Sequence, residues 1–148
     1  MSENTVINEL NTLLKGEQMA IEAYEKFIQF VENDVIKGEF QEIQKEHKKY
    51  ASDIAGRIQT LGGHPEYGTG LIGFMSGTKI AMQSTNKDTI DILKKAYDGE
   101  DKGIAMAEEI VKGDLDQESA EMVDGILSKD HDHLKRMMNL ISNFENKH

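Results

Sequence analysis

Ionisable side chains occupy the centre of the apolar face in each of four segments of this sequence. At 100° per residue, the apolar residues between positions 123 and 144 share one helical face, and Asp130 lies in the middle of that face with His133 on its flank. Glu17, His47 and Glu100 interrupt three other apolar faces in the same way. Because an unpaired buried charge costs several kcal/mol, each of these residues requires a partner, a proton or a metal ion.

Brought to a common depth, these residues would form a site for a transition-metal ion. Three carboxylates that lie close together repel one another, and a bound cation removes that repulsion. Carboxylate and imidazole ligands without sulfur suit iron, manganese or zinc. The alternative is a metal-free network in which the carboxylates pair with the two histidines and only specify packing, as in a helical interaction or stress protein.

Four long helices are expected to position these residues, because apolar side chains recur along the chain with helical spacing. Asp34 is expected to cap the second helix, and Gly62 and Gly63 to end it. With two short turns and one long middle connection, the helices form an all-α, antiparallel four-helix bundle of two helical hairpins. The expected helices cover about residues 4–30, 35–61, 87–112 and 116–144.

The connection between the two hairpins, residues 64–86, differs in composition from the helices. It is rich in glycine and contains the only proline of the chain. We expect a long crossover with a short apolar extra helix at about residues 71–83, where Gly73, Gly77 and Ala81 allow close approach of another backbone. This extra helix either covers one edge of the bundle or forms the contact of a homodimer.

The two halves of the chain match each other at an offset of 83 residues. This offset places Gly16 and Glu17 on Gly99 and Glu100, and it also brings several apolar positions into register. Such agreement is typical of a duplicated helical hairpin.

The same offset places His47 on Asp130, and the turns suggest a common depth for the four central residues. Glu17 and His47 each lie fifteen residues from the centre of the turn that joins their helices, and so do Glu100 and Asp130. Residues placed in this way in an antiparallel pair share a level. The sequence therefore predicts that the four side chains converge.

Composition limits the classes of protein to consider. A chain of 148 residues is long enough for one domain, residues 1–148, with a real core. The formal charge of −10 argues against a partner with a phosphate backbone such as nucleic acid. No signal sequence and no run of about 20 apolar residues is present, so we expect a cytoplasmic protein without a membrane partner.

Several motifs resemble those of the ferritin-like superfamily, in particular of small bacterial ferritin-like proteins without a rubredoxin domain. The first helix contains Leu-x-x-Leu-x-x-Gly-Glu, which is not specific alone, at residues 10–17. The second ends with Leu-Gly-Gly-His-Pro at 61–65, and the third contains Gly-Glu-Asp at 99–101. A helix with late histidines follows. The resemblance covers nearly the whole chain.

This resemblance implies a metal site inside the bundle, with iron the favoured ion and manganese or zinc as alternatives. One or two ions would be bound, and any enzymatic activity would be iron-dependent oxidation or reduction with dioxygen or peroxide. No catalytic residue is predicted. The absence of cysteine excludes the rubredoxin-like iron centre of rubrerythrins. The ligands that the resemblance implies are Glu17, Gln44, His47, Glu100, Asp130 and His133.

The chain departs from the family pattern at two ligand positions. Gln44 stands where the family has a bridging carboxylate, and Asp130 is shorter than the expected glutamate. Both departures favour a single ion as much as a pair. The family motif also aligns His47 with His133, which requires an offset of 86 residues and conflicts with the offset of 83.

Overall fold

Helices form almost all of the described part of the chain. The computed structural model describes residues 3–67, 88–113 and 115–147. Within these ranges the helices are α1 (Glu3–Phe30), α2 (Asp34–Thr60), α4 (Thr89–Gly113) and α5 (Gln117–Lys147), and no strand occurs. The predicted all-α, four-helix architecture is confirmed. The predicted extra helix at 71–83 and its dimer contact lie outside the described residues.

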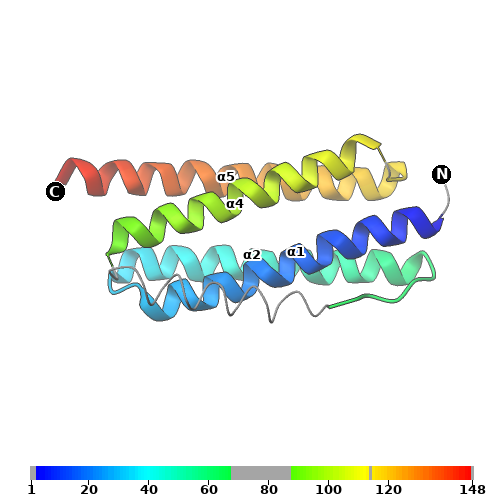
Figure 1. Ribbon diagram of the computed structural model, residues 1–148, viewed down its shortest axis with the longest axis horizontal. Coiled ribbons are helices and arrows are strands. Elements are labelled where there is room, and N and C mark those ends of the chain that lie inside the picture. Colours follow the sequence, from blue (N-terminus) through cyan, green and yellow to red (C-terminus); the bar gives the residue numbers. More distant parts are fainter. Residues whose placement is uncertain (1–2, 68–87, 114, 148) are drawn as a thin grey trace.

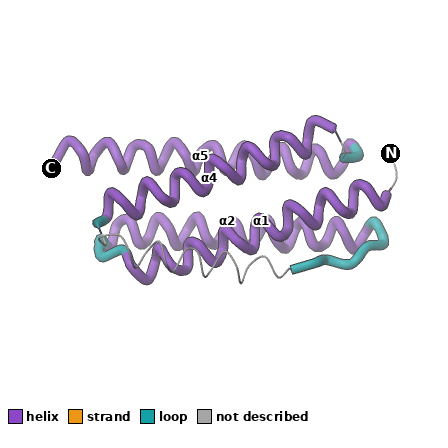
Figure 2. The backbone as a smooth tube through the Cα atoms, viewed as in Figure 1, coloured by secondary structure: helices purple, strands orange, loops and turns teal. Residues whose placement is uncertain are grey.

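The helices form two antiparallel hairpins, α1 with α2 and α4 with α5 (Figure 1). Helix α1 packs against α2 and α4, and α5 packs against α4 and α2. Helix α4 begins at the end of the bundle where α1 ends and α2 starts, whereas α2 finishes at the opposite end (Figures 1 and 2). The two ends that the connection joins therefore lie at opposite ends of the bundle. None of the described helices is long and apolar enough to span a membrane.

Capping residues define the ends of α2. Asn33, not Asp34, is the N-cap: its side chain accepts a hydrogen bond from the Ile36 amide at 3.0 Å, and its backbone is extended. The expectation for Asp34 was wrong by one position, because Asp34 is already helical. Gly62 and Gly63 end the helix as predicted, since their amides bond to the carbonyls of Gln59 and Ile58 and Gly62 has a φ of 88°.

Helix α5 is tied to α2 near its N-terminus. The Asp116 carboxylate accepts a hydrogen bond from the Ser119 amide at 3.3 Å, as an N-cap does. Arg57 of α2 donates to the same carboxylate at 2.8 Å and to the Ser119 hydroxyl at 3.0 Å. This contact holds the start of α5 against the last turn of α2.

Two apolar clusters make up the core, one toward each end of the bundle. The first includes Leu10, Leu14, Ile54, Ile58 and Val123. The second contains, among others, Tyr24, Phe40, Ile43, Leu93 and Met137. Every helix contributes to both clusters, and along each helix the two contributions are separated by the stretch that carries the interrupting polar residues.

Candidate metal centre

A polar layer lies between the two apolar clusters. Because the apolar residues on either side belong to different clusters, this layer is closed off from both ends of the bundle. Glu17 lies on α1, His47 on α2, Glu100 on α4, and Asp130 and His133 on α5. The convergence predicted from the sequence is therefore observed.

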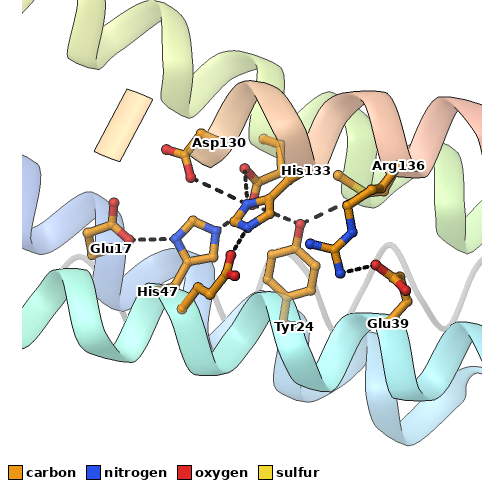
Figure 3. Close-up of polar contacts among 10 residues, drawn as sticks. Glu17, Tyr24, Glu39, His47, Asp130, His133 and Arg136 are labelled. Atoms are coloured by element: carbon orange, nitrogen blue, oxygen red, sulfur yellow. Dashed lines mark hydrogen bonds and ion pairs between the residues drawn. The ribbon is translucent and has the colours of Figure 1, made fainter. Parts of the chain in front are cut away.

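Four side chains of this layer could hold one ion together. His47, Glu100, Asp130 and His133 are all buried, and one ligand atom from each lies within 4.8 Å of the others. Figure 3 shows the side chains of His47, Asp130 and His133 pointing toward one another from α2 and α5. We refer to these four residues as the inner cluster.

His47 links the two hairpins through both of its ring nitrogens. Nδ1 lies 2.6 Å from Glu17 Oε2, and Nε2 contacts Glu100 Oε1 (Figure 3). The imidazole therefore has one nitrogen directed into the inner cluster and the other directed at α1. Only 12% of the Glu17 side chain is exposed.

His133 is held in a similar way. Nδ1 lies 3.4 Å from Asp130 Oδ1 and 3.5 Å from Glu100 Oε2, while Nε2 contacts Glu46 Oε2. Neither His133 Nδ1 nor Asp130 Oδ1 makes a hydrogen bond within the described part of the chain, although both atoms are fully buried. Unsatisfied buried polar atoms of this kind are rare, and a bound ion is one recognised explanation for them.

Tyr24 completes the surroundings of Glu100. Its hydroxyl donates a hydrogen bond to Glu100 Oε1 at 2.9 Å, and its ring stacks on the His47 imidazole at a centroid distance of 5.7 Å. Burial, followed by the negative charge of Glu100, raises the pKa of Tyr24 well above 10. The phenol therefore stays protonated and serves as a donor to the carboxylate.

The charges of the layer depend strongly on one another. Burial raises the pKa of Glu17 and of Asp130. Burial also opposes ionisation of Glu100, but the imidazoles of His133 and His47 outweigh it and lower that pKa to about 2. Likewise burial would lower the pKa of both histidines, but the neighbouring carboxylates raise it, well above 6.5 for His47 and to about 9 for His133.

The inner cluster suits a transition-metal ion. It offers two carboxylates and two imidazoles without sulfur, which is the donor chemistry of iron, manganese and zinc sites. A divalent cation would also replace protons that the isolated cluster needs in order to balance its carboxylates. The two unsatisfied atoms, Asp130 Oδ1 and His133 Nδ1, would gain a partner. The residues present therefore fit the ion that the sequence predicted.

A surface pocket of about 340 Å³ lies beside the inner cluster and is lined by residues of α2 and α5. His133 lies at its inner wall, and Glu46, with 35% of its side chain exposed, lies beside it. The remaining lining residues are Lys129, Asp132, Lys135 and Arg136. His133 itself has no exposed surface, so the pocket stops short of the inner cluster.

Gln44 and Glu46 mark the differences from the sequence-based expectation. The structure does not bring Gln44 into the inner cluster; its amide donates to the Ile21 carbonyl and to Glu25, both at 3.1 Å. Glu46 was not predicted, because it lies off the centre of the apolar stripe. The signal for Glu46 in the sequence is its position directly before His47.

The conflict between the two repeat offsets disappears in the structure. Asp130 and His133 are one helical turn apart, and both side chains reach Glu100 from the same face of α5. An offset of 83 residues and one of 86 residues therefore lead to neighbouring residues of one cluster.

Comparisons with known proteins support this fold. The family described as Domain of unknown function (DUF2383) matches residues 5–113 of the chain. No curated protein matches the sequence. Among solved structures, the bacterioferritin-related protein of Bacteroides fragilis, described as a dodecameric thioferritin, has 21% identity and a TM-score of 0.81 over 99% of this chain and 90% of its own.

Two further structures show the same arrangement of helices. A ferritin-like, diiron-carboxylate protein of Bacillus anthracis has 21% identity and a TM-score of 0.72 over 95% of this chain and 99% of its own. A two-domain protein of Anabaena variabilis, with DJ-1/ThiJ/PfpI-like and ferritin-like domains, has 20% identity and a TM-score of 0.81. The match covers 99% of this chain but only 38% of that protein. The predicted ferritin-like fold is confirmed.

Proposed function

Since the chain belongs to the family of the Domain of unknown function (DUF2383) and has a ferritin-like fold, we propose that it binds a transition-metal ion between its two hairpins. The ligands are the four residues of the inner cluster, His47, Glu100, Asp130 and His133. The observation that carries this proposal is their convergence, from three helices, in a closed layer where two buried polar atoms find no hydrogen bond among the described residues.

Iron is the ion we favour. Carboxylate and imidazole ligands suit iron, and the protein of similar fold from Bacillus anthracis is described as a diiron-carboxylate protein. Bound iron would supply redox chemistry with dioxygen or peroxide. The chain itself excludes bulk water through its two apolar clusters and holds Glu100 through the Tyr24 hydroxyl, and a surface pocket lies beside Glu46.

A metal-free structural network is the second candidate. It is favoured by one observation, namely that His47 already contacts a carboxylate at each ring nitrogen. In this case the buried ion pairs would only specify how the two hairpins dock.

Elemental analysis separates the two candidates. The untagged protein is purified without a chelating column, and metal per chain is measured before and after anaerobic addition of ferrous iron. The proposal expects at least one equivalent, which Glu100→Leu abolishes while the helical circular dichroism is retained. Asp101→Leu, at the neighbouring exposed carboxylate on α4, is the matched control and should keep the metal. A folded wild-type protein without metal in both states supports the structural network instead.

Self-association is a further part of the proposal. The bacterioferritin-related protein of similar fold is described as dodecameric, and this chain exposes 69% of Val35 and 44% of Met138 on its surface. Light scattering coupled to gel filtration should therefore give a multiple of the monomer mass. A monomer mass at micromolar concentration would contradict this expectation.

A further inference from the structure

Both histidines of the inner cluster have one ring nitrogen directed inward and the other directed at a carboxylate outside the cluster. For His47 the inward atom is Nε2 and the outward atom is Nδ1, which faces Glu17 at 2.6 Å. For His133 the inward atom is Nδ1 and the outward atom is Nε2, which faces Glu46. The two imidazoles thus face the cluster with different ring nitrogens, but in each ring the outward nitrogen contacts a glutamate.

The outer glutamates lie on the far side of the imidazoles from the inner cluster. Neither Glu17 nor Glu46 belongs to the group whose ligand atoms lie within 4.8 Å of one another. Glu17 reaches the layer from α1, whereas Glu46 reaches it from the same helix as His47 and at the edge of the surface pocket. Two different parts of the fold therefore supply the same kind of partner.

A neutral imidazole can bind a metal ion only through the nitrogen that carries no proton. The hydrogen bond made by the other nitrogen decides which tautomer is present, and metal-binding histidines usually make this bond to a carboxylate or a carbonyl. A carboxylate at the outward nitrogen keeps the proton there and turns the lone pair of the inward nitrogen toward the cluster.

We propose that Glu17 and Glu46 are positioning residues that hold His47 as its Nδ1–H tautomer and His133 as its Nε2–H tautomer. The ligand atoms are then His47 Nε2 and His133 Nδ1, together with oxygens of Glu100 and Asp130. This inference rests on the proposed metal binding. It gives Glu17 a different role from that of the ligand predicted from the sequence, and it leaves four protein ligands for one ion per chain.

Nitrogen NMR of the zinc-loaded protein tests the tautomers directly, because zinc is diamagnetic and takes the same donors. Long-range proton–nitrogen correlations are assigned with single His→Gln variants of the five histidines. We expect a metal-bound Nε2 in His47 and a metal-bound Nδ1 in His133, each with a protonated outward nitrogen. The opposite pattern at either ring overturns the proposal for that glutamate.

Zinc titrations of glutamate variants test the energetic role. Glu17→Ala and Glu46→Ala should keep one zinc equivalent but bind it about 10–100-fold more weakly, while Glu17→Gln and Glu46→Gln, which retain an acceptor oxygen, should recover part of the loss. Glu39→Ala is the matched control, because Glu39 also joins α2 to α5 through an ion pair, with Arg136, but contacts neither imidazole (Figure 3). Its affinity should equal that of the wild type.

The outcomes distinguish this inference from the proposed function. If wild type binds zinc and the alanine variants bind it equally well, the positioning role is wrong and the metal site stands. If Glu17→Ala lowers the number of bound ions, Glu17 is a ligand instead. If wild type binds no zinc, both proposals are overturned. Thermal unfolding of each metal-free variant shows whether it is folded, and the glutamine variants serve where an alanine variant is not.

Discussion

Asp130 is the residue whose chemistry is hardest to explain without a metal. It lies on the core face of α5 with 5% of its surface exposed, and its buried Oδ1 atom makes no hydrogen bond to any residue that the structure describes. Burial raises its pKa, because the ionised carboxylate is less stable inside the metal-free fold than in water. The carboxylate therefore does not stabilise the metal-free fold. A carboxylate at this position is expected to oppose folding until a cation is bound.

Replacing Asp130 with leucine should therefore lower the metal affinity without lowering the stability of the metal-free protein. In the presence of a chelator, Asp130→Leu should be as stable as wild type or more stable by about 1–2 kcal/mol, because an apolar side chain replaces a poorly satisfied buried charge. Its metal affinity should fall at least about 10-fold. Urea unfolding and zinc titration measure both effects.

The control for this variant is Asp132→Leu, at an exposed carboxylate two positions away on α5. Its stability should stay within about 0.5 kcal/mol of wild type. A large loss of stability in Asp130→Leu, with chelator present, would show that the carboxylate is needed for packing.

Metal affinity should rise with pH, because the histidines must lose protons to bind an ion. The carboxylates raise the pKa of His133 to about 9 and that of His47 well above 6.5, which favours the protonated form of both rings in the metal-free state. From about pH 6 to about pH 8 the logarithm of the apparent association constant should rise by about one to two per pH unit.

Calorimetry in buffers of different ionisation enthalpy measures the released protons directly. The metal-free protein should show the opposite trend in stability, since a raised histidine pKa stabilises the fold below the unfolded pKa and this contribution is lost as the pH rises through the folded pKa. An affinity that does not change with pH would mean that the imidazoles are not ligands.

Most of the site could be predicted from the sequence, but the outer partner Glu46 could not. Glu17, His47, Glu100 and Asp130 stood out because each replaces an apolar residue on a buried face. Glu46 gave no such signal, because its position on α2 is half-buried and a glutamate is ordinary there. Its role depends on how α5 is rotated against α2, which helical periodicity alone does not give.

At the scale of elements, glycines at the end of α2 fix where the chain leaves the bundle. Gly62 has a φ of 88°, a conformation that side chains with a Cβ atom rarely adopt. Gly62→Ala should therefore lower the free energy of unfolding by about 1 kcal/mol. Gly38→Ala, in the interior of α2 where an added Cβ meets no atom within 4 Å, should instead raise it by about 0.5–1 kcal/mol.

Urea unfolding of both glycine variants, with chelator present, checks that the two substitutions change the free energy of unfolding in opposite directions. Equal effects at the two positions would contradict the capping role of Gly62.

The helices themselves were predictable to within a few residues, since their apolar stripes are long and regular. The cap of α2 was misplaced by one position because Asn33 and Asp34 are both good capping residues, and only the backbone geometry distinguishes them. The order of the helices and the long crossover followed from turn lengths. The lateral packing of α1 on α4 and of α2 on α5 required the structure.

At the scale of the whole molecule, a bound ion should stabilise the bundle. Its ligands belong to α2, α4 and α5, so the ion joins the two hairpins and cannot bind the same way to an unfolded chain. At a free metal concentration of 100 times Kd, linkage gives about 2.7 kcal/mol, which corresponds to a rise in Tm of about 5–10 °C for a chain of this size.

Differential scanning calorimetry with zinc, and again after addition of EDTA, measures this shift. Glu100→Leu is the control and should show no response to zinc. A wild-type Tm that does not change with metal would contradict binding to the folded state.

The sequence separations of its contacts also predict the order in which the polar layer forms. Glu17 and His47 are 30 residues apart in the chain, whereas the contacts that join the hairpins span 53 residues for His47 with Glu100 and 87 for Glu46 with His133. Because closing a longer loop costs more entropy and the N-terminal hairpin leaves the ribosome first, α1 and α2 can pair before α5 has been synthesised. The nascent hairpin then carries His47 with Nδ1 already held by Glu17 and with Nε2 open to water, so the centre is completed only when the second hairpin docks.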